Sequence, residues 1–446
     1  MSETSGLRVA GAIRVGEPGY ETARRRLSAS AVVPDDHPAV IVRVTDRAQI
    51  PQALELARAE GLRVTVRSGG HSLAFAALRD GVLALDLSAL DRVRPDGDEA
   101  VIEPGATSLA VAEALAGTGR AFPVGHKADV ALGGFLLAGG NGWNQGRWGC
   151  AAESLLAAEV VNADGGERTI SPRCDPEAFA LLGGAGPGYP GVVAAFRVAL
   201  QPEPAVHRRA VTFAGAGDVG VAAGWADRLR AEIAPDVELT VFLAPDADAG
   251  VRVTVSATAY GADPAHAEAL LEVVSGPAVS RAARVEDHPT SIAAMLRSQS
   301  LRHPVGQASQ QAWSTASYAE LLPSLARVTA GCPSPLGSIL VSSSSYRRCA
   351  RPASAEDRAY RQLGTMTVAP YAAWDPAGGP GATAANRSWV AAAIDSVNEH
   401  WTGHYIGEVD LRATPERRER CFTDEVRDRL AALRRRWDPE GRFATP

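Results

Sequence analysis

Short apolar runs and amphipathic stretches alternate along residues 38–200. The apolar or β-branched runs predict buried strands at 39–44, 63–67, 81–90, 100–107 and 191–200. Between the first two strands, apolar residues recur on one helical face over 46–61, and Gly61 ends the predicted helix. A second helix is predicted at 108–119, and the tight Ala-Asp-Gly-Gly turn at 163–166 predicts a β-hairpin. This alternation is typical of an α/β region.

The pattern changes after residues 201–206, where two prolines indicate a domain boundary. Long alternating runs at 238–244 and 251–260 predict strands, and the amphipathic stretch at 264–274 predicts a helix after them. The order of these elements favours an α+β layer built on an antiparallel sheet.

Two further segments complete the pattern. Residues 375–386 are rich in glycine, proline and alanine, which predicts an exposed loop. The stretch 415–443 is predicted to form one amphipathic helix, which Asp438-Pro439 ends. The apolar side of this predicted helix consists of Phe422, Val426, Leu430, Leu433 and Trp437.

Length, charge and cysteine content narrow the class of protein. The 446 residues suggest two or three domain-sized units, and the net charge of −6 argues against a nucleic-acid partner. The chain has neither an apolar run long enough for a membrane span nor a secretory signal pattern at its start, so we expect a cytoplasmic protein without a membrane partner. The five cysteines are scattered and form no Cys-x-x-Cys pair, so we expect neither a metal site nor a disulfide framework.

Two glycine-rich segments carry the candidate chemistry. The predicted strand at 63–67 runs into Ser68-Gly69-Gly70 and presents His71, and successive backbone N–H groups of the loop Arg67–Ser72 can form an anion nest. Arg67 adds a charge for a phosphate. Residues 125–149 contain eight glycines, which allow the main chain to approach a flat or charged group closely. Together the segments indicate a site for a dinucleotide with a thin ring.

A G-x-G-x-x-G pattern at 186–191 is not interpreted as a second nucleotide site. That fingerprint needs a strand before it and a helix after it. Here a helix-like run precedes it, a strand-like run follows it, and two prolines interrupt it. We expect a turn.

Many motifs occur in the order found in one known family. They include "RSGGHSL", "FPVGHKADVALGGFLLAGGNGW", "VVNADGGERTISP", "GHYIGEVD" and "DPEGRF". In these, from about Tyr20 to Leu200 and from about Trp401 to Phe443, the chain resembles the berberine-bridge-enzyme-like flavoprotein oxidases of the vanillyl-alcohol-oxidase superfamily. The resemblance implies an α+β protein in which a two-part FAD-binding domain of the PCMH type is combined with an antiparallel-sheet substrate domain with helices. The implied domains are 1–205 (FAD-binding), 206–400 (substrate-binding) and 401–446 (completing the FAD-binding domain).

The resemblance also implies the cofactor and its attachment. His71 takes the place of the family histidine that is bonded to the 8α-methyl of FAD. Lys127 stands where doubly linked relatives have a second anchor, a cysteine, so a single covalent bond is implied, as in the 6-hydroxynicotine-oxidase type of site. The residues expected at the cofactor are Arg67, Ser68, Gly69, Gly70, His71, Ser72, Gly125, Asp129, Val130, Gly133, Gly134, Gly139, Gly142, Val192 and Tyr405.

The implied catalytic groups are Tyr405, which matches a family tyrosine that faces the flavin, and Glu408. If the segment is a strand, these two side chains point to opposite faces and at most one reaches the pocket, unless Gly407 introduces a bend. Gly407 stands where relatives often have asparagine, which leaves the acid–base scheme open. Val130 matches a position that gates oxygen in the family and favours an oxidase. His404, Tyr360 and Trp313 are weaker candidates.

The leading hypothesis is a covalent-FAD oxidase that acts on a C–OH or C–N centre of a small molecule and passes the electrons to O2. The richness in alanine, arginine and glycine is typical of a high-GC bacterium, and bacterial members of this family often tailor bulky secondary metabolites. A flavin-dependent cyclase or isomerase without net redox, and a flavin-containing drug-binding protein, are the alternatives. The sequence identifies neither the substrate nor the oligomeric state.

Overall fold

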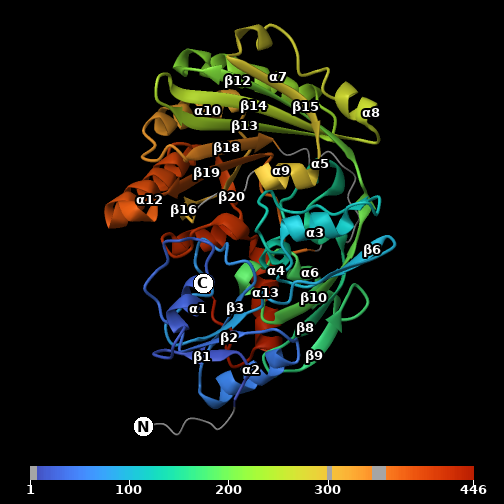
Figure 1. Ribbon diagram of the computed structural model, residues 1–446, viewed down its shortest axis with the longest axis vertical. Coiled ribbons are helices and arrows are strands. Elements are labelled where there is room, and N and C mark those ends of the chain that lie inside the picture. Colours follow the sequence, from blue (N-terminus) through green and yellow to red (C-terminus); the bar gives the residue numbers. More distant parts are fainter. Residues whose placement is uncertain (1–7, 299–303, 344–357, 446) are drawn as a thin grey trace.

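The computed structural model describes residues 8–298, 304–343 and 358–445. Figure 1 shows the first part of the chain, in blue and cyan, below a large sheet that is coloured green to orange. The end of the chain, in red, returns to the lower part. The fold therefore has two layers, with the first and last segments of the sequence in the same layer.

The first sheet has the strand order β1-β2-β4-β3. Strands β2, β4 and β3 are parallel, and β1 pairs with β2 in the antiparallel sense. Parallel strands are usually covered on both faces, and all four residues of β4 are buried. The bounds are β1 (Ala12–Arg14), β2 (Val40–Arg43), β3 (Val64–Arg67), β4 (Leu83–Asp86), α1 (Tyr20–Arg26) and α2 (Gln49–Ala59).

The second sheet is antiparallel, in the order β5-β6-β10-β8-β9. The hairpin predicted around 163–166 is confirmed, because β8 pairs with β9 across that turn. Strands β7 and β11, from the same part of the chain, form a separate two-stranded antiparallel ladder. The bounds are β5 (Val93–Asp96), β6 (Glu99–Ile102), β7 (Arg120–Ala121), β8 (Leu155–Val161), β9 (Glu167–Ile170), β10 (Val192–Ala199), β11 (Gln201–Pro202), α3 (Ser108–Leu115), α4 (Leu132–Leu137), α5 (Gln145–Trp148) and α6 (Pro176–Leu182).

The large sheet has the order β15-β12-β14-β13-β18-β19-β17-β20, and β16 also pairs with β19. Every pair in it is antiparallel, as the alternating runs predicted. The bounds are β12 (Ala205–Ala214), β13 (Val237–Asp246), β14 (Gly250–Gly261), β15 (Arg284–Thr290), β16 (Gly306–Ser309), β17 (Ala312–Ser314), β18 (Ser338–Ser343), β19 (Met366–Trp374), β20 (Trp401–His404), α7 (Val219–Glu232), α8 (Pro264–Ala269), α9 (Ile292–Ser298), α10 (Tyr318–Ala330) and α12 (Gly379–Asp395).

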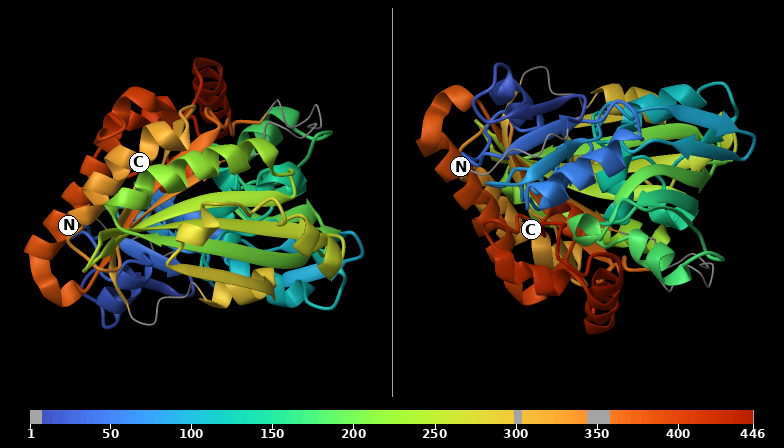
Figure 2. Two further views of the ribbon diagram at one scale, coloured as in Figure 1. Left: turned by 90° about the horizontal axis from the view of Figure 1, so that it is seen from above. Right: turned by 90° about the horizontal axis from the view of Figure 1, so that it is seen from below.

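The two faces of the large sheet differ in chemistry. Side chains such as Val241, Val255 and Val341 point to one face and form an apolar core with α7, α10 and α12. These helices lie on the side of the sheet away from the first two sheets (Figures 1 and 2). Side chains alternate between the two faces along each strand. The residues directly before and after each of these valines in its strand therefore face the first layer.

The chain crosses back to the first layer after His404. Strand β20 still pairs with β17 in the large sheet, so the return begins a few residues after the boundary expected at 401. Residue Phe443 then bridges to Val64 at the edge of the first sheet, where the N–H of Val64 donates to the carbonyl of Arg442 at 2.7 Å. The last residues thus extend a sheet that is built from the first ninety.

Two elements differ from the sequence prediction. Residues 415–443 do not form one helix: a 3₁₀ helix, η9 (Pro415–Cys421), is followed by α13 (Asp424–Trp437), because the Thr423 side chain accepts from the N–H of Val426 and begins a new helix. The loop expected at 375–386 is instead a 3₁₀ turn and the first turns of α12, whose start accommodates a proline.

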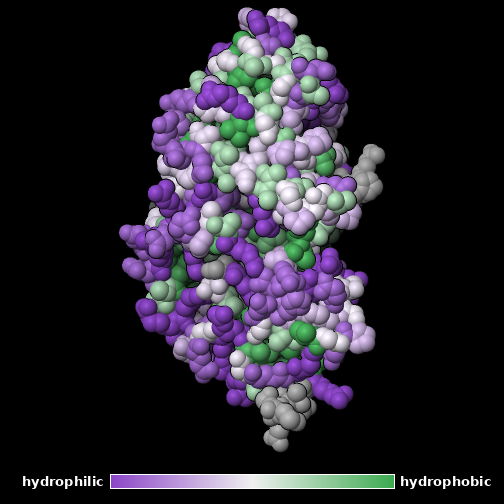
Figure 3. Space-filling view, turned by 90° about the vertical axis from the view of Figure 1, so that its left-hand side faces the viewer, coloured by the Kyte–Doolittle hydropathy of each residue, from purple (hydrophilic) through white to green (hydrophobic). Residues whose placement is uncertain are grey.

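Neither the face shown in Figure 3 nor the described helices indicate contact with a membrane. The face shown in Figure 3 is mostly hydrophilic, with small scattered apolar areas. Among the described residues, no helix combines the length and apolar character that crossing a bilayer requires.

We predict that Asp438→Ala destabilises the fold. The Asp438 carboxylate accepts from the N–H of Arg442 at 2.7 Å and from the N–H of Phe443 at 3.0 Å, and it is buried. Its loss leaves two backbone donors without a partner, which should lower the free energy of unfolding by about 2 kcal/mol. Thermal or denaturant unfolding measures the change, and Glu440→Ala, at an exposed carboxylate two residues away, is the matched control with an expected change near zero.

Candidate functional site

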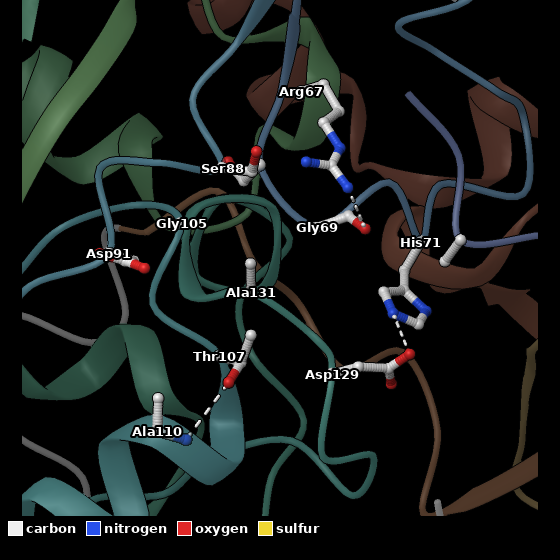
Figure 4. A pocket seen from close by; sticks show the side chains of 12 residues that line it. Arg67, Gly69, His71, Ser88, Asp91, Gly105, Thr107, Ala110, Asp129 and Ala131 are labelled. Carbon is white, nitrogen blue, oxygen red and sulfur yellow. Dashed lines mark hydrogen bonds and ion pairs between the residues drawn. The ribbon is translucent and has the colours of Figure 1, made fainter. Parts of the chain in front are cut away.

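A cavity of about 830 Å³ lies between the two layers. Its walls come from the loop after β3, from the glycine-rich segment at 125–145, from the large sheet and from the turn after β20. A smaller cavity of about 350 Å³ adjoins it, and both are lined by Arg67, Ser68, Gly69 and His71 (Figure 4). The candidate site therefore spans both parts of the fold.

The loop after β3 is held by Arg67. Its Nη1 donates to Asp86 on the neighbouring strand at 2.9 Å. Its Nη2 donates to the carbonyl of Gly69 at 3.2 Å, as Figure 4 shows. The sequence suggested this guanidinium as a phosphate ligand, but two of its three nitrogens already donate to the protein. Of the three guanidinium nitrogens of Arg67, only Nε has no hydrogen-bond partner among the described residues.

The two glycine-rich segments touch each other. A Cβ on Gly69 would lie 2.8 Å from the backbone nitrogen of Ala131, and a Cβ on Gly133 would overlap the Ser68 hydroxyl. Neither position tolerates a side chain without moving the neighbouring segment. The glycines therefore bring the 67–72 loop directly against the start of α4.

His71 projects from this loop toward Asp129. The His71 Nε2 lies 3.3 Å from Oδ2 of Asp129, which is ion-pair distance without hydrogen-bond geometry (Figure 4). The imidazole lowers the pKa of the Asp129 carboxyl, so a negative charge faces one nitrogen of the ring. The charged Asp129 carboxylate therefore lies next to the Nε2 side of the imidazole ring.

Most residues expected at the cofactor line these cavities. The larger cavity is lined by Arg67, Ser68, Gly69, Gly70, His71, Ser72, Gly125, Val130, Gly133, Gly134, Gly142, Tyr405 and Glu408. Asp129 lines the smaller one. Gly139 and Val192 line neither: Gly139 packs against the ring of Tyr360, and Val192 is fully buried in the core of the first sheet.

Tyr405 and Glu408 both reach the larger cavity, because the segment bends at Gly407, which is the alternative to a strand that the sequence left open. The strand ends at His404, and a 3₁₀ turn, η8 (Ile406–Glu408), follows it. Residues three apart lie on the same side of such a turn. Gly407 permits this arrangement, because a Cβ there would lie 2.7 Å from the ring of Tyr405. The Tyr405 ring thus occupies space that a side chain at 407 would need.

The sequence did not indicate Tyr371, which pairs with Glu408. The Tyr371 hydroxyl, from β19, donates to Oε2 of Glu408 at 2.6 Å. Burial raises the pKa of both groups, whereas the hydrogen bond from Tyr371 and the charges of Lys127 and His71 lower that of Glu408. The Lys127 ammonium lies 5.4 Å from the centre of the Tyr371 ring. Cross-strand pairing far apart in sequence creates this cluster, and no local motif at 371 could have revealed it.

The weaker candidates pack behind Tyr405. Rings of Trp313 and Tyr360 meet Tyr405 edge to face, with centroids 6.0 and 6.1 Å away. The His404 Nδ1 lies 3.2 Å from the carbonyl of Gln311, and burial lowers its pKa to about 4. Burial also raises the pKa of Tyr405, which disfavours a tyrosinate there. The rings of Trp313 and Tyr360 hold Tyr405 in place, whereas the ring of His404 packs against Trp401. None of these three side chains lines the cavity.

The large sheet presents hydroxyl groups to the cavity. Thr240 pairs across the sheet with Ser256 and Ser342, and Ser342 pairs in turn with Thr367. All four line the cavity, together with the apolar Phe242 and Leu340 one row away. This wall can accept and donate hydrogen bonds to an oxygen-bearing ligand.

These residues fit an extended dinucleotide that carries a flat ring. The main chain approaches closely at Gly69 and Gly133, the loop offers backbone N–H groups, and His71 presents an imidazole to the same space. Among the described residues, no group of three or more His, Cys, Asp or Glu side chains is arranged to hold a metal ion.

Comparison with known proteins agrees with this geometry. Residues 38–171 match the family described as FAD binding domain. The FAD-linked oxidoreductase penO of Penicillium crustosum is 34% identical over 223 residues, which are 50% of this chain and 49% of that protein. The chain thus spans about half the length of this fungal relative.

Solved structures share the whole fold. The chain superposes on 6-hydroxy-D-nicotine oxidase from Arthrobacter nicotinovorans with a TM-score of 0.84 and 24% identity, covering 99% of this chain and 98% of that one. It superposes on berberine bridge enzyme from Eschscholzia californica with a TM-score of 0.82 and 16% identity, covering 98% and 96%. At these identities the likeness establishes the fold.

Proposed function

We propose, from the premise that the chain is a berberine-bridge-enzyme-like protein with a PCMH-type FAD-binding domain, that it is an FAD-dependent oxidase of a small molecule. In the proposed reaction the substrate loses two electrons and two protons at a C–OH or C–N centre, and O2 is reduced to H2O2. The observation that carries the proposal is that His71 and the Tyr371–Glu408 pair line one cavity from its two opposite walls.

His71 is the proposed single covalent anchor of FAD. Its ring faces the cavity, and the neighbouring Asp129 favours the tautomer in which Nδ1 carries the lone pair. Lys127, which lines the same cavity, cannot form the thioether that a cysteine would. The proposed holoprotein therefore carries one bond to the cofactor, at position 71.

We predict that His71→Ala abolishes acid-stable flavin. The wild-type protein should retain its yellow colour after acid precipitation, and its intact mass should exceed that of the chain by one FAD. Lys127→Ala, which changes another side chain in the cavity, should keep the bond. Loss of all colour from the wild-type pellet, with an unmodified residue 71, would contradict the proposed link.

Glu408 and Tyr371 are the proposed proton acceptor and relay. When bound, FAD supplies the acceptor for the hydride that leaves the substrate carbon. The O–H or N–H proton of the substrate passes to the Tyr371 oxygen while Tyr371 gives its own proton to Glu408, 2.6 Å away. Lys127 stabilises negative charge on this pair. Tyr405, fixed by its aromatic neighbours, shapes the wall beside them.

We predict a distinct pH signature for this pair. Because Glu408 must be ionised to accept a proton, kcat/KM should rise with pH through its raised pKa and then level off. Tyr371→Phe removes a hydrogen bond that lowers this pKa, so the rise should move to higher pH. Glu408→Gln should remove the rise and lower kcat about 10²- to 10⁴-fold. Unchanged profiles in both variants, measured with a substrate that reduces the flavin, would exclude the pair as the proton acceptor.

The reaction with oxygen can be tested without knowing the substrate. Val130 lines the cavity and, by the resemblance, leaves room for O2 where a leucine would not. The flavin is reduced by light and EDTA without air and then mixed with aerated buffer. We predict rapid reoxidation with one H2O2 per flavin, slow reoxidation in Val130→Leu, and rapid reoxidation in Val130→Ala. Slow reoxidation of the wild type would instead favour a dehydrogenase or a non-redox flavoprotein.

A further inference from the structure

We propose that Glu238 is a second substrate-binding group, which receives a protonated amine of an elongated substrate in a part of the cavity remote from the Tyr371–Glu408 pair. This inference adds a substrate class to the proposed function. It rests on that function in one respect, which is that the substrate binds in the larger cavity.

Glu238 lies near the beginning of β13 and lines the larger cavity. Tyr371 belongs to the other end of the sheet's strands: it pairs with Ser338, and the next residue, Ile339, pairs with Leu243 toward the end of β13. The hydroxyl wall around Thr240 lies between Glu238 and Tyr371. A molecule that reaches both therefore crosses an oxygen-binding surface.

The surroundings of Glu238 are built for a carboxylate. The Tyr260 hydroxyl donates to Oε2 at 2.7 Å, and the N–H of Gln145 donates to Oε1 at 3.2 Å. Two donors aimed at the two oxygens favour the ionised acid as an acceptor, since a protonated acid would need an acceptor near its own O–H. Both donors belong to the protein, so the side chain is oriented before any ligand arrives.

What Glu238 lacks, among the residues that the structure describes, is a cation. Arg147, on the neighbouring α5, pairs with Asp236 at 3.7 Å. Arg208, two strands away, donates to Ser256 and lies 4.0 Å from Glu286. None of the groups that shift the pKa of Glu238 is positively charged, and burial raises that pKa to about 7. Glu238 is half-buried and lines the cavity, so a positively charged group of a ligand in the cavity can pair with it.

A protonated amine fits this position better than a neutral or anionic group. It brings the charge that Glu238 lacks, and its N–H groups point at oxygens that still have free lone pairs. A carboxylate would meet like charge, and a hydroxyl would leave the acid partly uncompensated. The substrate class is thus an amine-bearing molecule with oxygen functions along its length.

The test uses three small probes of one shape and different charge on the purified, flavin-containing protein: tryptamine (ammonium), tryptophol (hydroxyl) and indole-3-acetate (carboxylate). Isothermal titration calorimetry at pH 8 should show tryptamine binding about tenfold more tightly than tryptophol, and no detectable binding of indole-3-acetate. Equal affinity for tryptamine and tryptophol would overturn the proposal.

The pH dependence gives a second readout that needs no variant. With a pKa of about 7, Glu238 is about one-tenth ionised at pH 6 and nine-tenths ionised at pH 8, so the affinity for tryptamine should rise about tenfold between them. Titrations at pH 7 in two buffers of different ionisation enthalpy should show release of about half a proton per tryptamine bound. Absence of proton release would contradict the role of Glu238.

Variants connect the readouts to the residue. Glu238→Gln keeps the shape and can still accept from Gln145, so the fold should survive, but the preference for tryptamine and the proton release should disappear. Glu268→Gln makes the same change of charge at an exposed position on α8 and should leave both unchanged. If Glu238→Gln behaves like the wild type, the acid is only a link between β13 and α5. Because binding is measured without turnover, a failure here is separate from a failure of the oxidase proposal.

Discussion

The close approach of two glycine-rich segments is the constraint on which the site depends. At Gly69 and Gly133 the loop after β3 and the start of α4 are so near that neither position has room for a Cβ. This contact fixes where the loop ends and therefore where His71 points. Arg67 secures the same loop from behind through Asp86 and the Gly69 carbonyl. One wall of the cavity is thus made of backbone, held rigidly by an ion pair.

The opposite wall follows from the periodicity of β-strands. Every second residue of β13, β14 and β18 enters the apolar core under the helices, and the residues between them must face the first layer. In a sheet whose second face is exposed to water, these positions would normally carry polar and charged residues. Here the face is closed by the first layer, and it carries hydroxyls, Phe242, Glu238 and the arginines Arg208 and Arg252. The alternation that stabilises the sheet therefore also supplies the chemistry of the wall.

Sequence reasoning found the first wall and missed most of the second. The two glycine-rich segments and His71 have local patterns that predict a shared site, and the family resemblance added Asp129. Tyr371 and Glu238 become functional only through cross-strand pairing and through contacts with Glu408 and Tyr260, which no local pattern encodes. The turn after β20 was predicted only as an alternative to a strand, because the bend depends on Gly407, where a side chain would meet the Tyr405 ring.

The three acids of the site show how one enclosed space gives the same functional group different properties. His71 lowers the pKa of Asp129, so this acid is charged and orients an imidazole. Burial raises the pKa of Glu408, which makes it a better proton acceptor, while Lys127 and Tyr371 limit the rise. Glu238 is held by two donors without a cation, and its pKa lies near 7. A ligand that supplies positive charge would complete only the last of these environments, because the other two already contain their partners. The electrostatic environments of the cavity thus distinguish acids that are paired within the protein from the one proposed to bind a charged group of the substrate.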